Sequence, residues 1–185
     1  MLPELTTKDT MMFDLGCGYG RTLNYLKEKG FKNLYGSDIS IPMLKHSRET
    51  GAEVIQSEGR NIPFKNNVFD FVFLIAVLTC VTNSDEQKLM ASEIYRILKP
   101  GGILFIADFL LNDDERNKRR YKKYYNSSDS YGVFEIDDGA KLRHHDESYL
   151  RRLFSDFETK RYHKTVFNTM NGNRSNGVYL ILKKK

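Results

Sequence analysis

Short apolar runs alternate along this chain with longer segments in which apolar residues recur at helical spacing. The runs predict β-strands, and the segments between them predict amphipathic helices. Because the two kinds alternate, the pattern favours a parallel sheet with helices on both faces. Strands are expected at residues 10–13, 33–37, 53–56, 69–75, 103–109, 158–169 and 176–183. Helices are expected at residues 21–29, 41–49, 84–97, 112–125 and 147–154.

The longest predicted helix and the segments after it carry polar residues at their ends. Ser84 is expected to cap that helix, with Gln87 completing a capping box. Residues 131–145 are rich in charged and ring side chains and are expected to be irregular, and residues 171–173 (NGN) resemble a hairpin turn. The buried face of the helix is expected to carry Leu89, Met90, Ile94, Ile97 and Leu98.

The first predicted strand runs into a glycine-rich turn, residues 14–21 (DLGCGYGR), which leads into the first predicted helix. A strand, a tight turn and a helix form the first unit of a nucleotide-type site. Glycine lets backbone approach a ligand closely, and the start of the helix offers free N–H donors. The spacing is G-x-G-x-G rather than the G-x-G-x-x-G of a dinucleotide site, which disfavours an NAD-dependent oxidoreductase.

The turn and four later segments resemble the class I S-adenosylmethionine (SAM) dependent methyltransferases of the type 11-like kind, and the resemblance extends over residues 11–108. Residues 57–64 (SEGRNIPF) are similar to the family's G-D-A-x-x-L-P-F loop, with glutamate where the family usually has aspartate. The resemblance implies a Rossmann-like α/β fold, with a seven-stranded, mostly parallel sheet, an antiparallel C-terminal strand and helices on both faces. The other three segments are residues 33–39, 69–75 and 93–102.

The resemblance also implies SAM as the cofactor, S-adenosylhomocysteine as the product, and roles for residues at the strand ends. In the family, the acidic residue at Asp14 supports the methionine part of SAM, and the one at Asp38 binds the ribose hydroxyls. The apolar residue at Ile39 lies on the adenine, and Glu58 stands where the family's aspartate meets the adenine amino group. Capping roles are the alternative for the two aspartates. The cofactor-binding residues are expected to be Asp14, Gly16, Cys17, Gly18, Gly20, Asp38, Ile39, Met43, Glu58, Gly59, Arg60, Ile75 and Ala76.

Length and composition favour one globular domain over residues 1–185, with a substrate-side insertion at about residues 110–147. No apolar run approaches the roughly 20 residues of a membrane helix, and no secretory signal is recognisable, so a cytoplasmic location is expected. Cys17 and Cys80 suggest no disulfide framework and have no partners at metal-ligand spacing, so no metal is expected. We expect a monomer or a homodimer.

The chain is basic, with a formal net charge of +5. Lysine and arginine concentrate in residues 116–123 and 183–185. A basic tract suits nucleic acid, but acids at the start of a helix and bases further along also suit the helix dipole. Because residues 113–115 are acidic, a solvated helix face is favoured. An RNA or protein acceptor bound by the basic helix is the alternative.

Two missing motifs narrow the choice of methyl acceptor. Residues 75–80 contain neither the N-P-P-Y motif for amino groups nor the Pro-Cys pair of cytosine C5 enzymes. Direct SN2 transfer to an O, N or C atom of a small molecule is therefore expected, and a non-catalytic SAM-binding module is a further alternative. His144, His145 and Asp108 are the candidate catalytic residues, with capping, packing and loop support as the alternatives. The substrate pocket is expected to include Tyr121, Tyr124, Tyr131 and Asn171.

Overall fold

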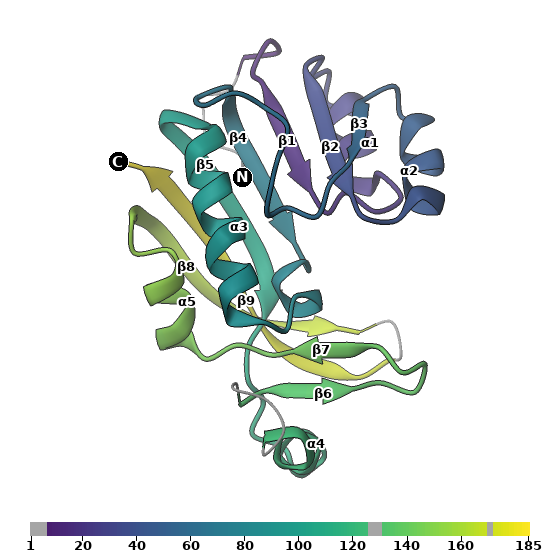
Figure 1. The fold of residues 1–185 in the computed structure, drawn as a ribbon, viewed down its shortest axis with the longest axis vertical. Coiled ribbons are helices and arrows are strands. Elements are labelled where there is room, and N and C mark those ends of the chain that lie inside the picture. The colour runs from purple at the N-terminus through teal and green to yellow at the C-terminus, as the bar shows by residue number, and fades with distance from the viewer. Residues whose placement is uncertain (1–6, 126–130, 170–171) are drawn as a thin grey trace.

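A computed structural model of the chain describes residues 7–125, 131–169 and 172–185. In this part, seven strands form one sheet in the order β3-β2-β1-β4-β5-β9-β8 (Figure 1). β1 to β5 are parallel, and β9 runs antiparallel between β5 and β8, which confirms the predicted fold. The strands are β1 (Met12–Leu15), β2 (Leu34–Asp38), β3 (Glu53–Gln56), β4 (Phe69–Ile75), β5 (Leu98–Phe109), β8 (Phe157–Asn168) and β9 (Arg174–Lys184).

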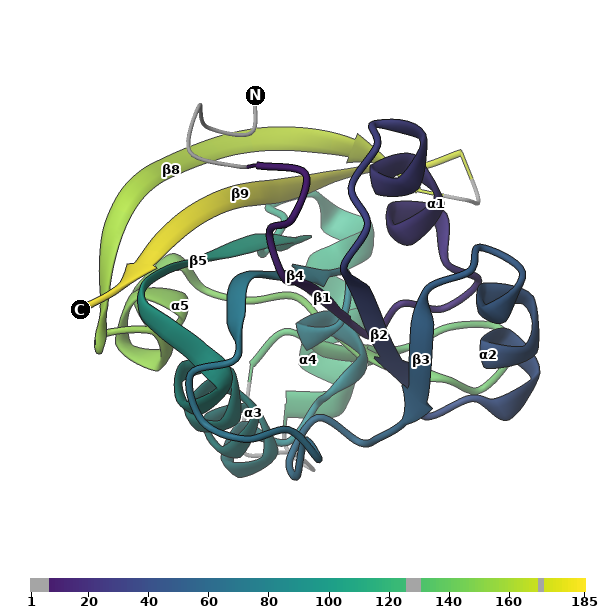
Figure 2. The ribbon, with the colours of Figure 1, turned by 90° about the horizontal axis from the view of Figure 1, so that it is seen from above.

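Helices lie on both sides of the sheet, as predicted, but they cover its two faces unequally. α3 and α5 pack on one face, whereas α1 and α2 lie on the other side, close to β1 and β2 (Figures 1 and 2). Among the described residues, no helix is long and apolar enough to cross a bilayer. The helices of the sheet region are α1 (Arg21–Glu28), α2 (Ile41–Arg48), the single 3₁₀ turn η1 (Leu78–Cys80), α3 (Ser84–Ile97) and α5 (Glu147–Leu153).

The sheet divides the apolar core into two clusters. The larger one lies under α3 and α5, where Met90, Ile94 and Ile97 of α3 are buried. Burying one such side chain stabilises a fold by roughly 1.5–3 kcal/mol. Leu89, which was predicted to join them, is 53% exposed, because the apolar face that α3 packs on the sheet is narrower than the predicted one. The smaller cluster packs α1, through Leu23, against β1 and β4.

The N-terminus of α3 differs from the prediction. Asn83, not Ser84, is the cap: its side-chain oxygen accepts the N–H groups of Asp85 at 2.8 Å and Glu86 at 3.1 Å. Gln87 completes no capping box, because its side chain is buried and donates to main-chain carbonyls below the helix. The cap therefore lies one residue earlier than predicted, and the Gln87 side chain forms hydrogen bonds inside the protein.

Residues 131–145, predicted to be irregular, contain a hairpin of β6 (Val133–Glu135) and β7 (Lys141–Arg143). The hairpin packs against α4 (Glu115–Tyr125) at the end of the molecule toward which β4 and β5 run (Figure 1). α4 begins at Glu115 rather than at residue 112 because Asn112 is buried, with its amide donating to Leu110 and Ser175. The region predicted as a substrate-side insertion thus carries α4 and this hairpin.

Replacing Asn83 by alanine tests the corrected cap. The free energy of unfolding should fall by about 1 kcal/mol, because the first N–H groups of α3 lose their acceptor. Urea denaturation measures the change. Ser92→Ala, an exposed substitution in the same helix, serves as the control and should leave stability almost unchanged. An Asn83→Ala variant as stable as this control would contradict the assignment.

Candidate functional site

The glycine-rich turn after β1 lies against the segment that follows β4. Gly16 and Gly20 have positive φ angles of 76° and 81°. A Cβ at Gly16 would lie 2.4 Å from Cγ2 of Val77, closer than real Cβ atoms approach. The backbone N–H groups of Gly16 and Cys17 both donate to the carbonyl of Ser37 at 2.8 Å. The turn is a narrow cradle that joins the ends of β1, β2 and β4 and has no room for a side chain at its base.

Asp38 holds its carboxylate at the mouth of this cradle. One carboxylate oxygen accepts the N–H of Gly18 at 2.9 Å, and the other accepts the N–H of Ser40 at 2.9 Å. A carboxylate has about four lone-pair sites, so both oxygens keep capacity to accept further hydroxyl groups. The side chain is half-buried, oriented and open on one side, which suits the predicted contact with the ribose of SAM.

Apolar side chains flank Asp38 on the surface. Ile39 is 66% exposed and Tyr19 is 57% exposed, and Met43 is half-buried beside Gly18. Large apolar groups exposed around oriented polar groups are typical of a ligand surface. This surface suits an adenine ring, which is flat and apolar on its faces. Tyr19 was not among the predicted residues, although its place between two glycines of the turn could have suggested it.

Asp14 lies buried beneath the turn, where a positive charge would compensate it. Burial raises the pKa of Asp14 to about 7, an effect that the Thr22 hydrogen bond opposes and the Asp38 carboxylate reinforces. Two carboxyl groups near one cradle favour a cationic ligand. The SAM sulfonium and its ammonium group are both cations, so the chemistry of these donors fits the cofactor. Thr22 is a further residue that the sequence reasoning missed.

The loop after β3 presents Glu58 at the surface, paired with arginine. Arg60 donates to Glu58 and, at 3.0 Å, to Glu86 of α3. The side chains of Glu58 and Arg60 are 66% and 43% exposed. Gly59 packs below them, where an added Cβ would lie 3.0 Å from Met90. The ion pair orders the loop, and a contact of Glu58 or Arg60 with adenine stays a prediction.

The end of β4 is conformationally unusual. Ala76, the residue after Ile75, is exposed and has a φ of 54°, which a residue with a Cβ adopts rarely. Its carbonyl accepts the Cys80 thiol at 3.5 Å. Such strain clusters at ligand sites. Cys17, in contrast, is buried with its thiol 3.6 Å from the Ser47 hydroxyl, so only its backbone belongs to the cradle.

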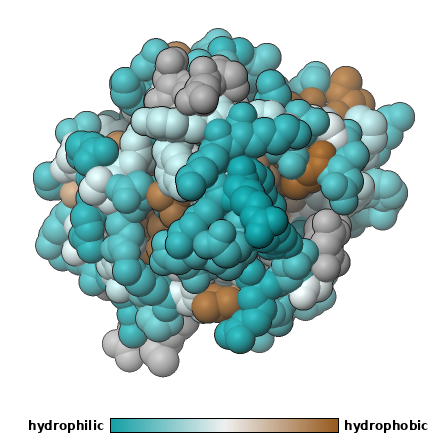
Figure 3. Space-filling model, turned by 90° about the horizontal axis from the view of Figure 1, so that it is seen from below, coloured by the Kyte–Doolittle hydropathy of each residue, from teal (hydrophilic) through white to brown (hydrophobic). Residues whose placement is uncertain are grey.

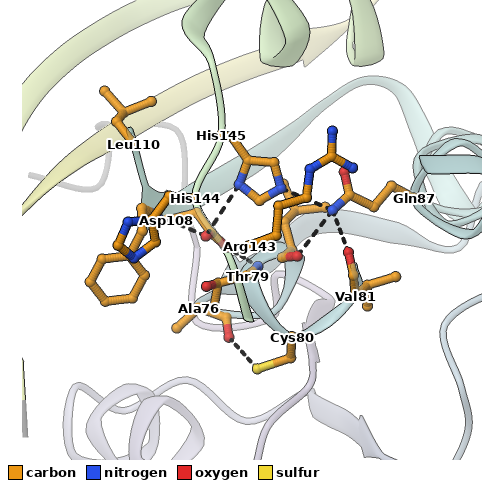
Figure 4. A network of polar contacts seen from close by, with 12 residues as sticks. Ala76, Thr79, Cys80, Val81, Gln87, Asp108, Leu110, Arg143, His144 and His145 are labelled. Carbon is orange, nitrogen blue, oxygen red and sulfur yellow. Dashed lines mark hydrogen bonds and ion pairs between the residues drawn. The ribbon is translucent and has the colours of Figure 1, made fainter. Parts of the chain in front are cut away.

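Asp108, at the end of β5, collects backbone donors (Figure 4). It accepts the N–H of Phe109 at 2.7 Å and of Thr79 at 3.3 Å, and it is fully buried. Burial raises the pKa of Asp108 to about 7, against the lowering effect of these N–H groups and those of Leu78 and Val77. The carboxyl group therefore holds η1, the turn that follows β4. This contact matches the alternative role of loop support given for Asp108 in the sequence analysis.

His145 lies beside Asp108 and is equally enclosed (Figure 4). Its Nε2 lies 2.9 Å from the amide nitrogen of Gln87, and its Nδ1 lies 3.9 Å from a carboxyl oxygen of Asp108. Burial lowers the pKa of His145 to about 3, and the nearby Arg143 guanidinium lowers it further. His145 and Asp108 are therefore not an ion pair near neutral pH.

His144 belongs to a second buried group under α4. Its Nδ1 lies 2.6 Å from the hydroxyl oxygen of Tyr121 and 3.1 Å from the amide nitrogen of Asn112. Its ring stacks on Phe109, with ring centroids 5.5 Å apart. Burial lowers the pKa of His144 to about 3, and Arg120 adds to this effect. Both histidines are neutral, enclosed and hydrogen-bonded within the protein, and their catalytic role stays a prediction that this geometry disfavours.

The predicted tyrosine pocket is only partly on the surface. Tyr121 is 1% exposed and packs inside, whereas Tyr131 is 41% exposed and touches its ring. Tyr124 is half-buried on α4, and Asn171 lies outside the described residues. Seen from below Figure 1, the α4 side of the molecule is largely hydrophilic, with only small apolar areas (Figure 3). The acceptor-side residues that the sequence missed are Gln87, Asn112, Arg143 and Tyr149, none of which has a motif.

The chain matches the methyltransferase-domain family over residues 13–106, the span that holds the cradle, Asp38 and the end of β4. The chain belongs to this family. Membership accounts for the arrangement of the first five strands, and SAM is the cofactor that the predicted family and the cradle both imply.

Curated relatives differ in what they act on. A probable tRNA methyltransferase 9B of Mus musculus is 30% identical over 114 residues, covering 62% of this chain and 24% of that protein. A ubiquinone/menaquinone biosynthesis C-methyltransferase of Klebsiella pneumoniae is 30% identical over 146 residues, covering 69% of this chain and 57% of that protein. This methyltransferase-family chain spans about a quarter of the length of the first curated relatives it matches.

A solved structure shares nearly the whole fold. A SAM-dependent methyltransferase of Methanosarcina mazei superposes with a TM-score of 0.91 at 24% identity, covering 97% of this chain and 94% of that chain. A further one, from Mesorhizobium loti, has a TM-score of 0.74 at 16% identity, covering 99% and 94%. The similarity extends over almost all of the chain.

The raised pKa of Asp14 predicts how SAM affinity depends on pH. Below about pH 7 the carboxyl group is protonated and loses its attraction for a cation, so affinity should rise roughly tenfold between about pH 6 and pH 8. Isothermal titration with SAM measures this. Asp14→Asn should bind more weakly and show a flatter profile. An Asp14→Asn profile parallel to that of the unmodified chain would assign the titration to another group.

The lowered pKa of His145 predicts a change in the pH dependence of stability. Unfolded, His145 takes up a proton near its ordinary value of 6.5, but folded it stays neutral to about pH 3. It therefore lowers the free energy of unfolding as pH falls through this window. His145→Gln should remove that loss, about 1.4 kcal/mol per pH unit. Urea denaturation between about pH 4.5 and 6.5 measures both slopes.

The exposed His46→Gln on α2 is the matched control for this measurement. It should leave the slope as in the unmodified chain. The buried Asp14 and Asp108 act in the opposite direction in this window, because their folded pKa values exceed the unfolded ones. The comparison of slopes between variants cancels their effect. Identical slopes for His145→Gln and the unmodified chain would show that folded His145 binds a proton.

Proposed function

We propose that this chain is a SAM-dependent methyltransferase that acts by positioning its substrates, without a side chain acting as general base. The observation that carries the proposal is the glycine cradle with Asp38 oriented at its mouth. Bound SAM supplies an activated methyl group on a sulfonium sulfur. The work left to the protein is to hold the acceptor in line with that group, which is worth several orders of magnitude in rate.

The residues around the cradle have separate tasks in this proposal. Asp38 binds the ribose, and its orientation by Gly18 and Ser40 means that little conformational freedom is lost on binding. Asp14 supplies negative charge under the cationic part of the ligand. The acceptor approaches from the edge formed by Ala76 and η1, which the buried Asp108 keeps in place.

Among the described residues, the burial of the two candidate histidines supports a reaction without a general base. His145 is 1% exposed and His144 is 4% exposed, and their imidazoles bond Gln87 and Tyr121 inside the protein. A base must reach the proton that it removes within hydrogen-bond distance. An acceptor whose reacting atom carries a lone pair at neutral pH would need no such group.

The relatives leave the acceptor class open. The mouse relative is a probable tRNA methyltransferase, and the Klebsiella relative is a C-methyltransferase of quinone biosynthesis. A small-molecule acceptor remains the prediction from the missing base-methylation motifs, and RNA is the second candidate. The observation that favours RNA is the basic surface: Arg116, Arg119 and Lys122 are exposed on α4.

Isothermal titration with SAM, S-adenosylhomocysteine and NAD tests the cofactor assignment. One-to-one binding of both sulfur ligands and none of NAD is expected, and Asp38→Ala should weaken SAM binding at least roughly tenfold, because two charge-assisted hydrogen bonds to the ribose are lost. The control is Glu49→Ala, which removes the same charge from the exposed surface of α2. Equal affinity of the two variants for SAM would contradict the proposal.

A further inference from the structure

A groove of about 1260 Å³ lies on the face of the sheet that α3 and α5 do not cover. Residues of β4, β5 and β9 form its floor, α1 forms one wall, and β8, which curves away from the plane of the sheet, forms the opposite wall (Figure 2). The groove exceeds the roughly 300–1,000 Å³ typical of small-molecule pockets, and it is open along its length. Its size and shape suit a polymer better than a compact molecule.

Aromatic rings from adjacent strands form the floor of the groove. Phe73 and Phe105 have ring centroids 6.2 Å apart, and Phe105 and Tyr179 are 5.9 Å apart. The ring of His163 on β8 continues the row, 6.3 Å from Tyr179 and nearly parallel to it. Phe105 and Tyr179 are only partly buried, and His163 is exposed. A row of rings on an open sheet face is a surface on which flat, unpaired bases stack.

Cations surround this aromatic floor. Lys8, Arg21, Lys29 and Arg161 line the groove and are exposed. Among the described residues that line the groove, no carboxylate compensates the positive charge of the rim. An occupant that carries negative charge on its outside and flat apolar rings inside complements both features at once.

The two faces of β8 differ in this respect. On the face away from the groove, Lys164 pairs with Glu147 of α5. On the groove face, Arg161 has no carboxylate within ion-pair distance among the described residues. An ion pair therefore neutralises Lys164 on one face, whereas Arg161 on the groove face is available to an anionic partner. Salt bridges within the protein thus do not account for Arg161.

We propose that this groove binds a single strand of RNA, with bases stacked on Phe105 and Tyr179 and phosphates on the basic rim. A second copy of the chain would bring a second basic rim against the first, so like charges oppose self-association there. A DNA strand shares the bases and phosphates. Thr7 and Tyr179 line the groove, and hydroxyl groups such as theirs suit the ribose 2′-hydroxyl that DNA lacks, which favours RNA.

The groove leads to the cofactor edge. Arg21 and Thr22 at the start of α1 and Ile75 at the end of β4 line one part of it, and Thr22 bonds the buried Asp14. A strand lying in the groove would reach the mouth of the site. That the strand carries the methyl acceptor rests on the proposed function, whereas RNA binding in the groove does not.

Fluorescence anisotropy with a labelled single-stranded RNA of about 12 nucleotides, long enough for a site of this kind, tests the groove. Tyr179→Leu should weaken binding roughly tenfold, because a stacking ring is replaced by an apolar side chain without a flat face. Tyr179→Phe should retain most of the affinity. Arg161→Gln should make the slope of log affinity against log salt shallower by about 0.7, the effect of one lost phosphate contact.

Two matched controls separate the groove from other basic surfaces. Lys164→Gln removes a cation from the opposite face of β8, where it pairs with Glu147, and should leave RNA affinity unchanged. Lys65→Gln removes an exposed cation from the loop after β3, outside the groove, and should also have no effect, whereas Arg119→Gln tests α4 as the competing RNA surface. Circular dichroism of every variant verifies folding, and SAM titration separates the two proposals: RNA binding without SAM binding would contradict only the proposed function.

Four results would overturn the groove assignment. These are no RNA binding, equal binding of duplex or of DNA with the same sequence, loss of affinity in Arg119→Gln but not in Arg161→Gln, and a dimer in sedimentation that Tyr179→Leu dissociates. The expected result is single-strand RNA binding that weakens steeply with salt and depends on Tyr179 and Arg161.

Discussion

The tight contact between the glycine turn and the segment after β4 is the constraint on which the site depends. At Gly16 the backbone passes so close to Val77 that a Cβ has no room. Two N–H groups of the turn bond the end of β2, and Asp38 bonds the turn in return. The ends of β1, β2 and β4 are thereby joined without any side chain in the ligand space. The exposed Ile39 and Ala76 derive their positions from the same contact.

The edge proposed for the acceptor is built on a different principle, the burial of polar groups in neutral networks. Asp108 gathers N–H groups of η1, and His145 connects this loop through Gln87 to α3. His144 connects β5 through Asn112 and Tyr121 to α4. A buried polar group without a partner costs roughly 1–3 kcal/mol, so these bonds specify one arrangement of α3, α4 and η1. The histidines therefore shape the acceptor edge from below rather than facing it.

The unequal cover of the sheet separates two recognition tasks. The face under α3 and α5 holds the larger core and is closed to partners. The other face is covered beside α1 only, and further along it becomes the aromatic groove with Lys29 and Arg161 on its rim. The groove meets the glycine-rich turn at Arg21, the first residue of α1. One edge of the molecule thus combines a cradle for a cationic cofactor with a groove whose charge attracts anions.

The sequence alone determined the seven strands of the main sheet, most helices and the cofactor turn, because each depends on local periodicity or on glycines within a few residues of one another. It also placed Asp14 and Asp38 at strand ends. Only the tertiary structure decided that His144 and His145 are buried and neutral. Their sequence context suits an exposed loop, and their burial depends on Gln87, Asn112 and Tyr121 from three other segments. The groove likewise joins residues from α1 to β9, and no local pattern shows which sheet face remains uncovered.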